Sequence, residues 1–177
     1  MKKHLMALLL LVSLLCTVLS GCGDGSAEQT PEDRAQANTI NVGIAQDLDE
    51  SLDPHKTVKA GTREVMFNVF EGLMKPTSNG DLTPAVAESY TVSDDHRTYT
   101  FTLREGVKFH NGDAVTAEDV IYSIQRCIAP AETGIVPVEA FSIITDIQAL
   151  DERTVAITIS EPSNEFISYL TTAILPA

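Results

Sequence analysis

The sequence has no tryptophan and only three cysteines, so it has few residues for thiol chemistry. Cys16 and Cys22 lie in or next to an amino-terminal apolar segment, which leaves Cys127 alone in the rest of the chain. A single cysteine excludes a disulfide within that part. Cys127 has no histidine nearby in the sequence and stands beside Ile124 and Ile128. We therefore expect it to be a small core residue and not a catalytic thiol.

Basic residues are also few, at 12 Lys and Arg against 25 Asp and Glu, which gives a formal net charge of -13. The lack of a basic stripe argues against a nucleic acid partner, and an acidic body is repelled by anionic lipid. Catalytic motifs are missing too, because the chain has no Gly-x-Ser-x-Gly, no phosphate-binding glycine loop and no Ser/His/Asp order. The histidines do not pair at metal-ligand spacing: His4, His55, His96 and His110. We predict no enzyme activity, no catalytic residue, no metal site and no cofactor, and we interpret the scattered carboxylates as a solvated surface.

The first 21 residues have the layout of a bacterial secretory signal. Two lysines precede an apolar run, Leu5 to Leu19, which is too short for a comfortable membrane span. The string Leu19-Ser20-Gly21-Cys22 then resembles the lipobox of bacterial lipoproteins. That resemblance implies that residues 1–21 are removed and that the Cys22 thiol receives diacylglycerol, which carries acyl chains such as palmitate. Each methylene of these chains that is buried in the membrane stabilises the anchoring by ~0.8 kcal/mol. The alternative is a chance cysteine at the end of an ordinary signal.

Residues 22–38 predict a flexible tether, because no large apolar side chain occurs between Gly23 and Asn38. From Thr39 the pattern changes, and apolar residues alternate with small or polar ones through Ala45, which predicts a short strand. We therefore place the folded part at residues 39–177.

Four further segments of the folded part carry local signals. Leu52-Asp53-Pro54 predicts a turn, and Ser78–Asp81 another. Apolar residues at helical spacing predict a helix from about Ala60 to Leu73, with Gly72 as its terminator. Pro84 predicts a short helical turn over Val86 and Ala87.

Two hairpins and two helices complete the prediction. Alternation predicts one hairpin from Tyr90 to Leu103 and a second from Ile143 to Ile159. Between them, Thr116 and Asp119 have the spacing of a capping box at a helix start. The buried stripe of that helix is expected at Val120, Ile121, Ile124 and Ile128, and a last helix is expected from Pro162 with Phe166, Ile167 and Leu170.

Six strings of the folded part stand out as a set: LDPHK (52–56), FEGLM (70–74), PAVAES (84–89), YTFTLR (99–104), GVKFHNGD (106–113) and TAEDVIYS (116–123). These strings, in this order, resemble family 5 extracellular solute-binding proteins. Such proteins are the oligopeptide-, dipeptide- and nickel-binding components of bacterial ABC importers.

The resemblance implies an α/β, two-lobed periplasmic-binding-protein type II fold, here its amino-terminal part with an α+β accessory domain. Family members are much longer, so we expect a truncated or partial sequence. The implied function is that of a substrate-binding lipoprotein that captures an oligopeptide or dipeptide and delivers it to ABC permease subunits. It also implies a monomer that is lipid-anchored to the cell membrane and faces the periplasm or the cell exterior.

Two segments resemble the cleft-facing loops of the peptide binders. Ligand contacts are expected at Val58, Lys59, Ala60 and Gly61, where an extended backbone can pair with a peptide main chain. The others are expected in the loop that follows the helix ending near Ile128: Glu132, Thr133, Gly134, Ile135 and Val136. Two alternatives stay open, a nickel or metal-chelate binder and a surface adhesin or sensor without transport. A neighbouring gene for a permease or an ATPase would separate the second alternative from the importer.

The lipobox yields a direct prediction. In bacteria fed labelled palmitate, the wild-type protein should take up label and partition into detergent, whereas Cys22→Ala should do neither because it lacks the acceptor thiol. Cys16→Ala changes a cysteine of the removed segment and should label like wild type. Equal labelling of Cys22→Ala would contradict the lipoprotein hypothesis.

Overall fold

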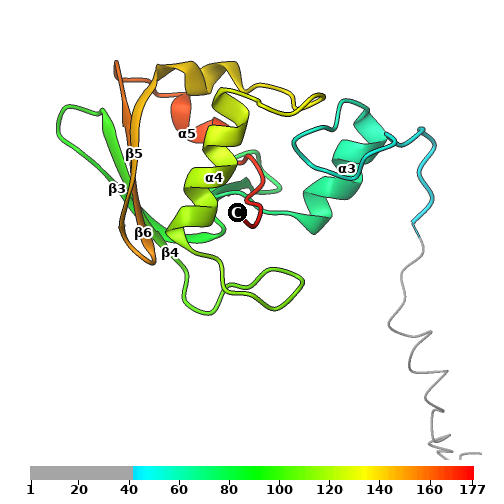
Figure 1. Ribbon diagram of the computed structural model, residues 1–177, viewed down its shortest axis with the longest axis horizontal. Coiled ribbons are helices and arrows are strands. Elements are labelled where there is room, and N and C mark those ends of the chain that lie inside the picture. The colour runs from blue at the N-terminus through cyan, green and yellow to red at the C-terminus, as the bar shows by residue number, and fades with distance from the viewer. Residues whose placement is uncertain (1–41) are drawn as a thin grey trace, which may run out of the picture. The chain divides into compact units, whose positions relative to one another are not determined.

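The computed structural model describes residues 42–177, and its compact unit runs from Ile44 to Ala177 (Figure 1). The expected signal (1–21), Cys22, the tether (22–38) and the start of the expected strand lie outside the described residues. None of the helices described is both long enough and apolar enough to span a membrane. The elements are α3 (Ala60–Val69), β1 (Met74–Pro76), β2 (Leu82–Pro84), β3 (Ala87–Val92), β4 (Thr98–Leu103), α4 (Ala117–Ile128), the 3-10 helix η1 (Glu139–Ile143), β5 (Ile144–Asp151), β6 (Thr154–Ile159) and α5 (Phe166–Tyr169).

An antiparallel sheet in the order β3-β4-β6-β5 supports the main core. In β4 and β6 every second residue is buried, because successive side chains of a strand point to opposite faces. Phe101 pairs with Val155 and Tyr99 with Ile157, so the two central strands present their buried residues on the same face. The antiparallel pairing of β3 with β4 and of β5 with β6 confirms both predicted hairpins.

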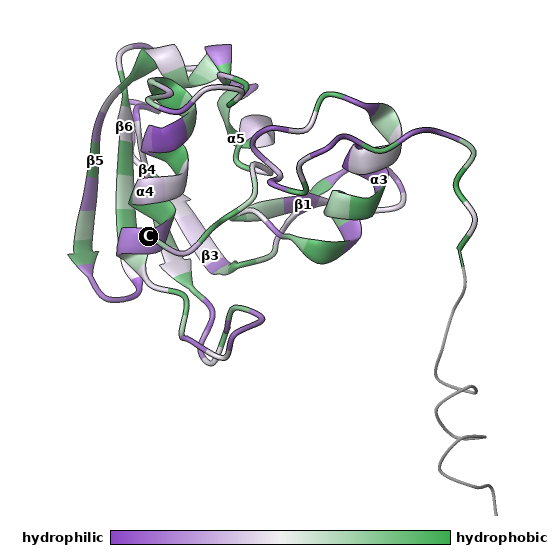
Figure 2. Ribbon diagram, turned by 45° about the vertical axis from the view of Figure 1, so that its right-hand side comes forward, coloured by the Kyte–Doolittle hydropathy of each residue, from purple (hydrophilic) through white to green (hydrophobic). Residues whose placement is uncertain are grey.

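Helix α4 packs on this sheet, and Figure 2 shows apolar and polar residues side by side along it. Its capping box is confirmed, because the Thr116 hydroxyl accepts from the Asp119 amide and the Asp119 carboxylate accepts from the Thr116 amide at 2.8 Å. The buried stripe continues through Cys127 and not through Ile128, which is 36% exposed. The expectation for Cys127 as a core residue is confirmed, and burial raises the pKa of its thiol to about 11.

Three local expectations are wrong. Residues 42–45 form no strand, since no neighbouring strand pairs with them in the part of the chain that the structure describes. Pro84 ends strand β2, which pairs with β1, and Ala87 begins β3, so no helical turn forms there. The last helix, α5, begins at Phe166 and not at Pro162.

Gly72 has a different role from the one expected of it. Helix α3 ends at Val69, before Gly72, so this glycine does not terminate it. A Cβ on Gly72 would lie 2.6 Å from the Leu170 carbonyl oxygen and 2.6 Å from the Thr171 carbonyl carbon. The backbones meet here because the Met74 amide donates to the Leu170 carbonyl at 3.0 Å. Glycine is thus required by the close approach of the segment that follows α5.

Replacing this glycine should destabilise the fold. Gly72→Ala forces two backbone segments apart, and overpacking of this kind lowers the free energy of unfolding by about 1–3 kcal/mol. Gly43→Ala is the matched control, because a Cβ there would meet nothing within 4 Å. Urea denaturation measures both. Equal loss of stability in the two variants would show that the close backbone approach does not require glycine at position 72.

Candidate functional site

The first candidate segment is only partly extended. Val58 and Lys59 precede α3, whereas Ala60 and Gly61 form its first turn, so the expectation of an extended backbone is wrong for these two. The amides of Val58 and Lys59 both donate to one carboxylate oxygen of Asp49, at 3.1 and 3.0 Å. The Lys59 amide is the main reason that the pKa of Asp49 is lowered. These two amides are therefore already used within the chain.

Free main-chain donors occur one residue further on. The first N–H groups of an α-helix have no partner inside the helix. Within residues 42–177, no hydrogen bond satisfies the amides of Ala60 and Gly61. Ala60 is exposed and Gly61 is buried, so the Ala60 amide is the donor best placed for a ligand.

The second candidate segment follows α4. Glu132, Thr133 and Gly134 form an exposed turn, and Gly134 has a φ of 89°, in the left-handed region that favours glycine. Ile135 is only 7% exposed and its side chain packs inward, while Val136 is 38% exposed. The Val136 amide donates to the His55 carbonyl at 2.8 Å. This bond joins the second candidate segment to the turn at residues 53–56.

Arg126 of α4 connects the second candidate segment to the turn at residues 53–56 through its guanidinium group, although sequence reasoning did not single it out. Its Nη1 and Nη2 donate to the two carboxylate oxygens of Asp53 at 3.0 and 2.7 Å. Nη2 also lies 3.2 Å from the Glu132 carboxylate, which Lys56 contacts at 3.0 Å. Hydrogen bonds from Arg126 are the first cause of the lowered pKa of both Asp53 and Glu132, and the bond to Asp53 is the first cause of the raised pKa of Arg126.

A pattern in α4 does mark Arg126. Asp119, Ser123 and Arg126 repeat at spacings of four and three, so they lie along one edge of the helix beside the apolar stripe. All three hold distant chain. Asp119 accepts from the Ala177 amide at 3.0 Å, and the Ser123 hydroxyl accepts from the Leu175 amide at 2.8 Å. The interpretation of carboxylates as solvated surface is therefore wrong for Asp119 and Asp53, which act inside the fold.

His55 is buried at this junction and has two defined partners. Its Nε2 lies 2.8 Å from the Ala173 carbonyl oxygen, and its Nδ1 lies 3.2 Å from Nη1 of Arg126. Arginine can only donate, so Nδ1 must accept and the ring proton must be on Nε2, where it donates to Ala173. Burial is the main reason that the pKa of His55 is lowered, which agrees with a neutral ring.

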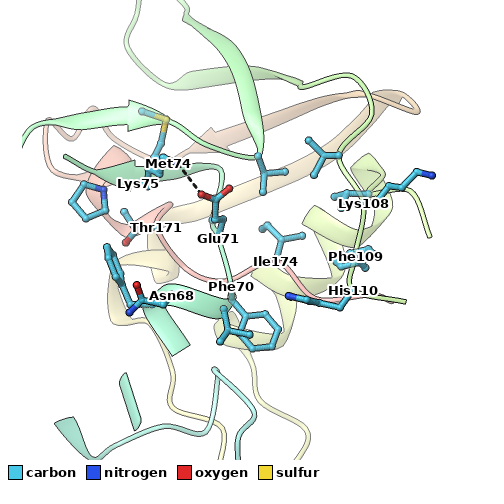
Figure 3. Close-up of a pocket in the computed structure, with 17 residues that line it drawn as sticks. Asn68, Phe70, Glu71, Met74, Lys75, Lys108, Phe109, His110, Thr171 and Ile174 are labelled. Atoms are coloured by element: carbon cyan, nitrogen blue, oxygen red, sulfur yellow. Dashed lines mark hydrogen bonds and ion pairs between the residues drawn. The ribbon is translucent and has the colours of Figure 1, made fainter. Parts of the chain in front are cut away.

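A small hollow of about 170 Å³ is lined by Arg126, Glu132 and Ile135, and two bigger hollows also open on the described part of the molecule. The larger, about 800 Å³, lies among Phe70, Met74, Phe109 and Ile174 and includes the Lys75–Glu71 ion pair at 2.8 Å (Figure 3). It contains none of the nine candidate ligand residues. The smaller, about 450 Å³, is lined by His55, Thr57 and Val136, among others, and so adjoins the second candidate segment. Among residues 42–177, no three His, Cys, Asp or Glu side chains are grouped to hold a metal ion.

Comparison with known proteins identifies a matching family. The profile of the bacterial extracellular solute-binding proteins, family 5 (middle part), matches residues 81–177. The dipeptide-binding protein DppE of Bacillus subtilis is 30% identical over 172 residues, which cover 87% of this chain and 32% of that protein. The chain thus spans about a third of the length of this curated relative.

Solved structures agree. Haemophilus influenzae OppA in complex with the peptide RPPGFSPFR superposes with a TM-score of 0.66 and 29% identity, over 73% of this chain and 32% of OppA. Campylobacter jejuni NikZ in complex with Ni(L-His) superposes with a TM-score of 0.64 and 28% identity, over 74% of this chain and 26% of NikZ. These likenesses confirm the expected fold class, the type II periplasmic-binding-protein fold.

The buried histidine predicts a dependence of stability on pH. The pKa of His55 is below 6.5 in the folded protein. At a pH between 6.5 and this lowered pKa, the unfolded chain therefore binds more protons than the folded protein does. The contribution of the neutral ring is complete above that window and is lost as the pH falls through it. Arg126 and Asp53, which face the ring, stay charged throughout. The free energy of unfolding from urea titrations should therefore fall as the pH is lowered below about 6.5.

A matched pair of variants isolates this effect. His55→Gln removes the titrating group and should flatten the pH dependence, whereas His96→Asn, in an exposed turn with a φ of 56°, leaves His55 in place and should keep it. An unchanged slope in His55→Gln would show that another group is responsible.

Proposed function

Because the chain belongs to family 5 of the bacterial extracellular solute-binding proteins, we propose that it forms part of the peptide-binding component of an ABC importer. In this proposal the component captures an oligopeptide or dipeptide outside the cytoplasmic membrane and delivers it to the permease subunits. It acts as a monomer, and the lipid on Cys22 holds it at the membrane. The chain spans about a third or less of its relatives, so the proposal concerns a protein of family length that contains this chain.

The observation that carries the proposal is the likeness to a relative that was solved with a bound peptide. The relatives compared are binding proteins and not enzymes. Peptides of different sequence share the same main-chain groups, so a receptor with exposed main-chain donors can bind many of them. We place the ligand contacts in residues 58–61, where the Ala60 amide is the exposed donor, and in residues 132–136.

The geometry favours a specific form of main-chain recognition. Strand addition along the whole first segment is disfavoured, because Asp49 already accepts from the Val58 and Lys59 amides. The first turn of α3 instead offers the Ala60 amide, at the positive end of a ten-residue helix. We propose that a peptide carbonyl accepts from this amide while the peptide crosses the Glu132–Val136 turn.

A nickel chelate is the second candidate ligand, and the likeness to NikZ with Ni(L-His) favours it. A metal ion that arrives with its own ligands needs few from the protein. The two ligand classes are separated by thermal unfolding of the family-length protein with a random short-peptide pool or with nickel and histidine. Stabilisation by the nickel mixture alone would contradict the peptide proposal.

The Ala60 amide can be removed without breaking the helix. Ala60 is the first residue of α3, where proline is tolerated, and Lys59 already has the extended backbone (φ -77°, ψ 140°) that a following proline requires. In the family-length protein, Ala60→Pro should weaken many peptides alike, by up to about tenfold for one lost hydrogen bond. Its melting temperature should stay close to that of wild type.

The matched control is Ala60→Ser, which keeps the amide and changes the side chain at the same position. It should bind peptides like wild type in calorimetry. If Ala60→Pro also binds normally, the first turn of α3 is not a ligand contact.

A further inference from the structure

Two chain segments contact Arg126, whose side chain is only 9% exposed, and a third is linked to it through the His55 ring. They are the turn 53–56, the candidate ligand loop 132–136 and the segment 171–174 that follows α5. We propose that Arg126 is a positioning residue that sets the geometry of the ligand site through Asp53, Glu132 and His55. The part of this inference that concerns ligand affinity rests on the proposed function, whereas the part that concerns the loops does not.

The first connection is the fork between Arg126 and Asp53. Two parallel hydrogen bonds between a planar guanidinium and a carboxylate fix orientation as well as distance. Asp53 Oδ1 also accepts from the His55 amide at 3.0 Å, so the same carboxylate shapes the turn that leads to Val58. Lysine cannot reproduce this fork, because its ammonium group is a single point charge.

The second connection runs to the ligand loop at both of its ends. Glu132, at the start, faces Arg126 and Lys56, but its side chain is 51% exposed, so these ion pairs orient the loop and add little stability. Val136, at the end, donates its amide to the His55 carbonyl. Arg126 therefore acts on the loop directly through Glu132 and indirectly through the turn that Asp53 holds.

The third connection goes through the His55 ring. Because Arg126 donates to Nδ1, the ring is restricted to the tautomer whose Nε2–H binds the Ala173 carbonyl. Loss of the guanidinium removes the donor to Nδ1, whereas the Ala173 carbonyl still accepts from Nε2–H and keeps the proton there. The hydrogen bond to Nδ1 is thus the signature of Arg126 that a general loss of packing would not reproduce.

The test uses the whole chain with Arg126→Gln, Arg126→Lys and, as matched control, Glu132→Gln. Arg126→Gln should speed amide hydrogen exchange at Val136 by about tenfold and leave the Ile157 amide in central strand β6 at its wild-type rate. The ¹⁵N shift of His55 Nδ1 should move downfield, because that nitrogen loses its donor, while Nε2 stays protonated. Arg126→Lys should lie between, and Glu132→Gln should keep the wild-type ring pattern.

Two results would overturn the inference. One is wild-type exchange at Val136 together with an unchanged ring pattern in Arg126→Gln. The other is equal acceleration at Val136 and Ile157, which would make Arg126 a general stabilising residue. Should Arg126→Gln not fold, the same comparison of Val136 with Ile157 in Arg126→Lys decides the question.

Peptide affinity of the family-length protein gives the second readout. Arg126→Gln should bind a short-peptide pool at least about fivefold more weakly than Glu132→Gln, because only the former frees both segments. Equal affinities of the two variants would contradict the role in ligand positioning. If wild type binds no peptide, the proposed function fails, and the hydrogen-exchange rates and the Nδ1 shift still decide whether Arg126 positions the loops.

Discussion

The paired hydrogen bonds between Arg126 and Asp53 are the interaction on which the arrangement of the candidate site depends. Both groups are largely withdrawn from water, with side chains 9% and 22% exposed. Removing two charges from water costs much of what their attraction returns, so such a pair contributes mainly a defined geometry. Here that geometry brings the turn at residues 53–56 against the loop at residues 132–136. The apolar core includes neither Arg126 nor Asp53. Without the pair, the two segments would no longer be held at a fixed distance and orientation.

Helix α4 serves two functions with two edges. Its apolar stripe packs on the sheet and anchors it, while Asp119, Ser123 and Arg126 hold chain that lies far away in sequence. The backbone at Gly72 closely approaches residues 170–172, just before the chain that Asp119 and Ser123 hold. The rigid sheet and helix thus supply the platform, and the polar edge of α4 places the loops that we propose to contact ligand. Such a division suits a receptor that binds varied peptides through main-chain groups.

Much of the fold was predictable, for reasons that differ between elements. Alternation in β4 and β6 and the capping box at Thr116 are local signals, and the structure confirms them. Gly72 was misread because a glycine near a helix end has two uses, and only the distant backbone at Leu170 shows which applies. Arg126 was missed because its partner Asp53 lies 73 residues away. Its spacing from Asp119 and Ser123 was visible, but the spacing alone does not say what that edge of the helix holds.

The central claim is that the first turn of α3 and the loop after α4 together form the ligand-binding edge of a peptide receptor. Backbone amide shifts of the isotope-labelled, family-length protein, titrated with a short-peptide pool, test it most directly. The account predicts saturable shifts at Ala60 and Gly61 and at residues 132–136, with little change in β4 and β6. Saturable shifts confined to other regions, or shifts at these positions with nickel and histidine but with no peptide, would contradict it.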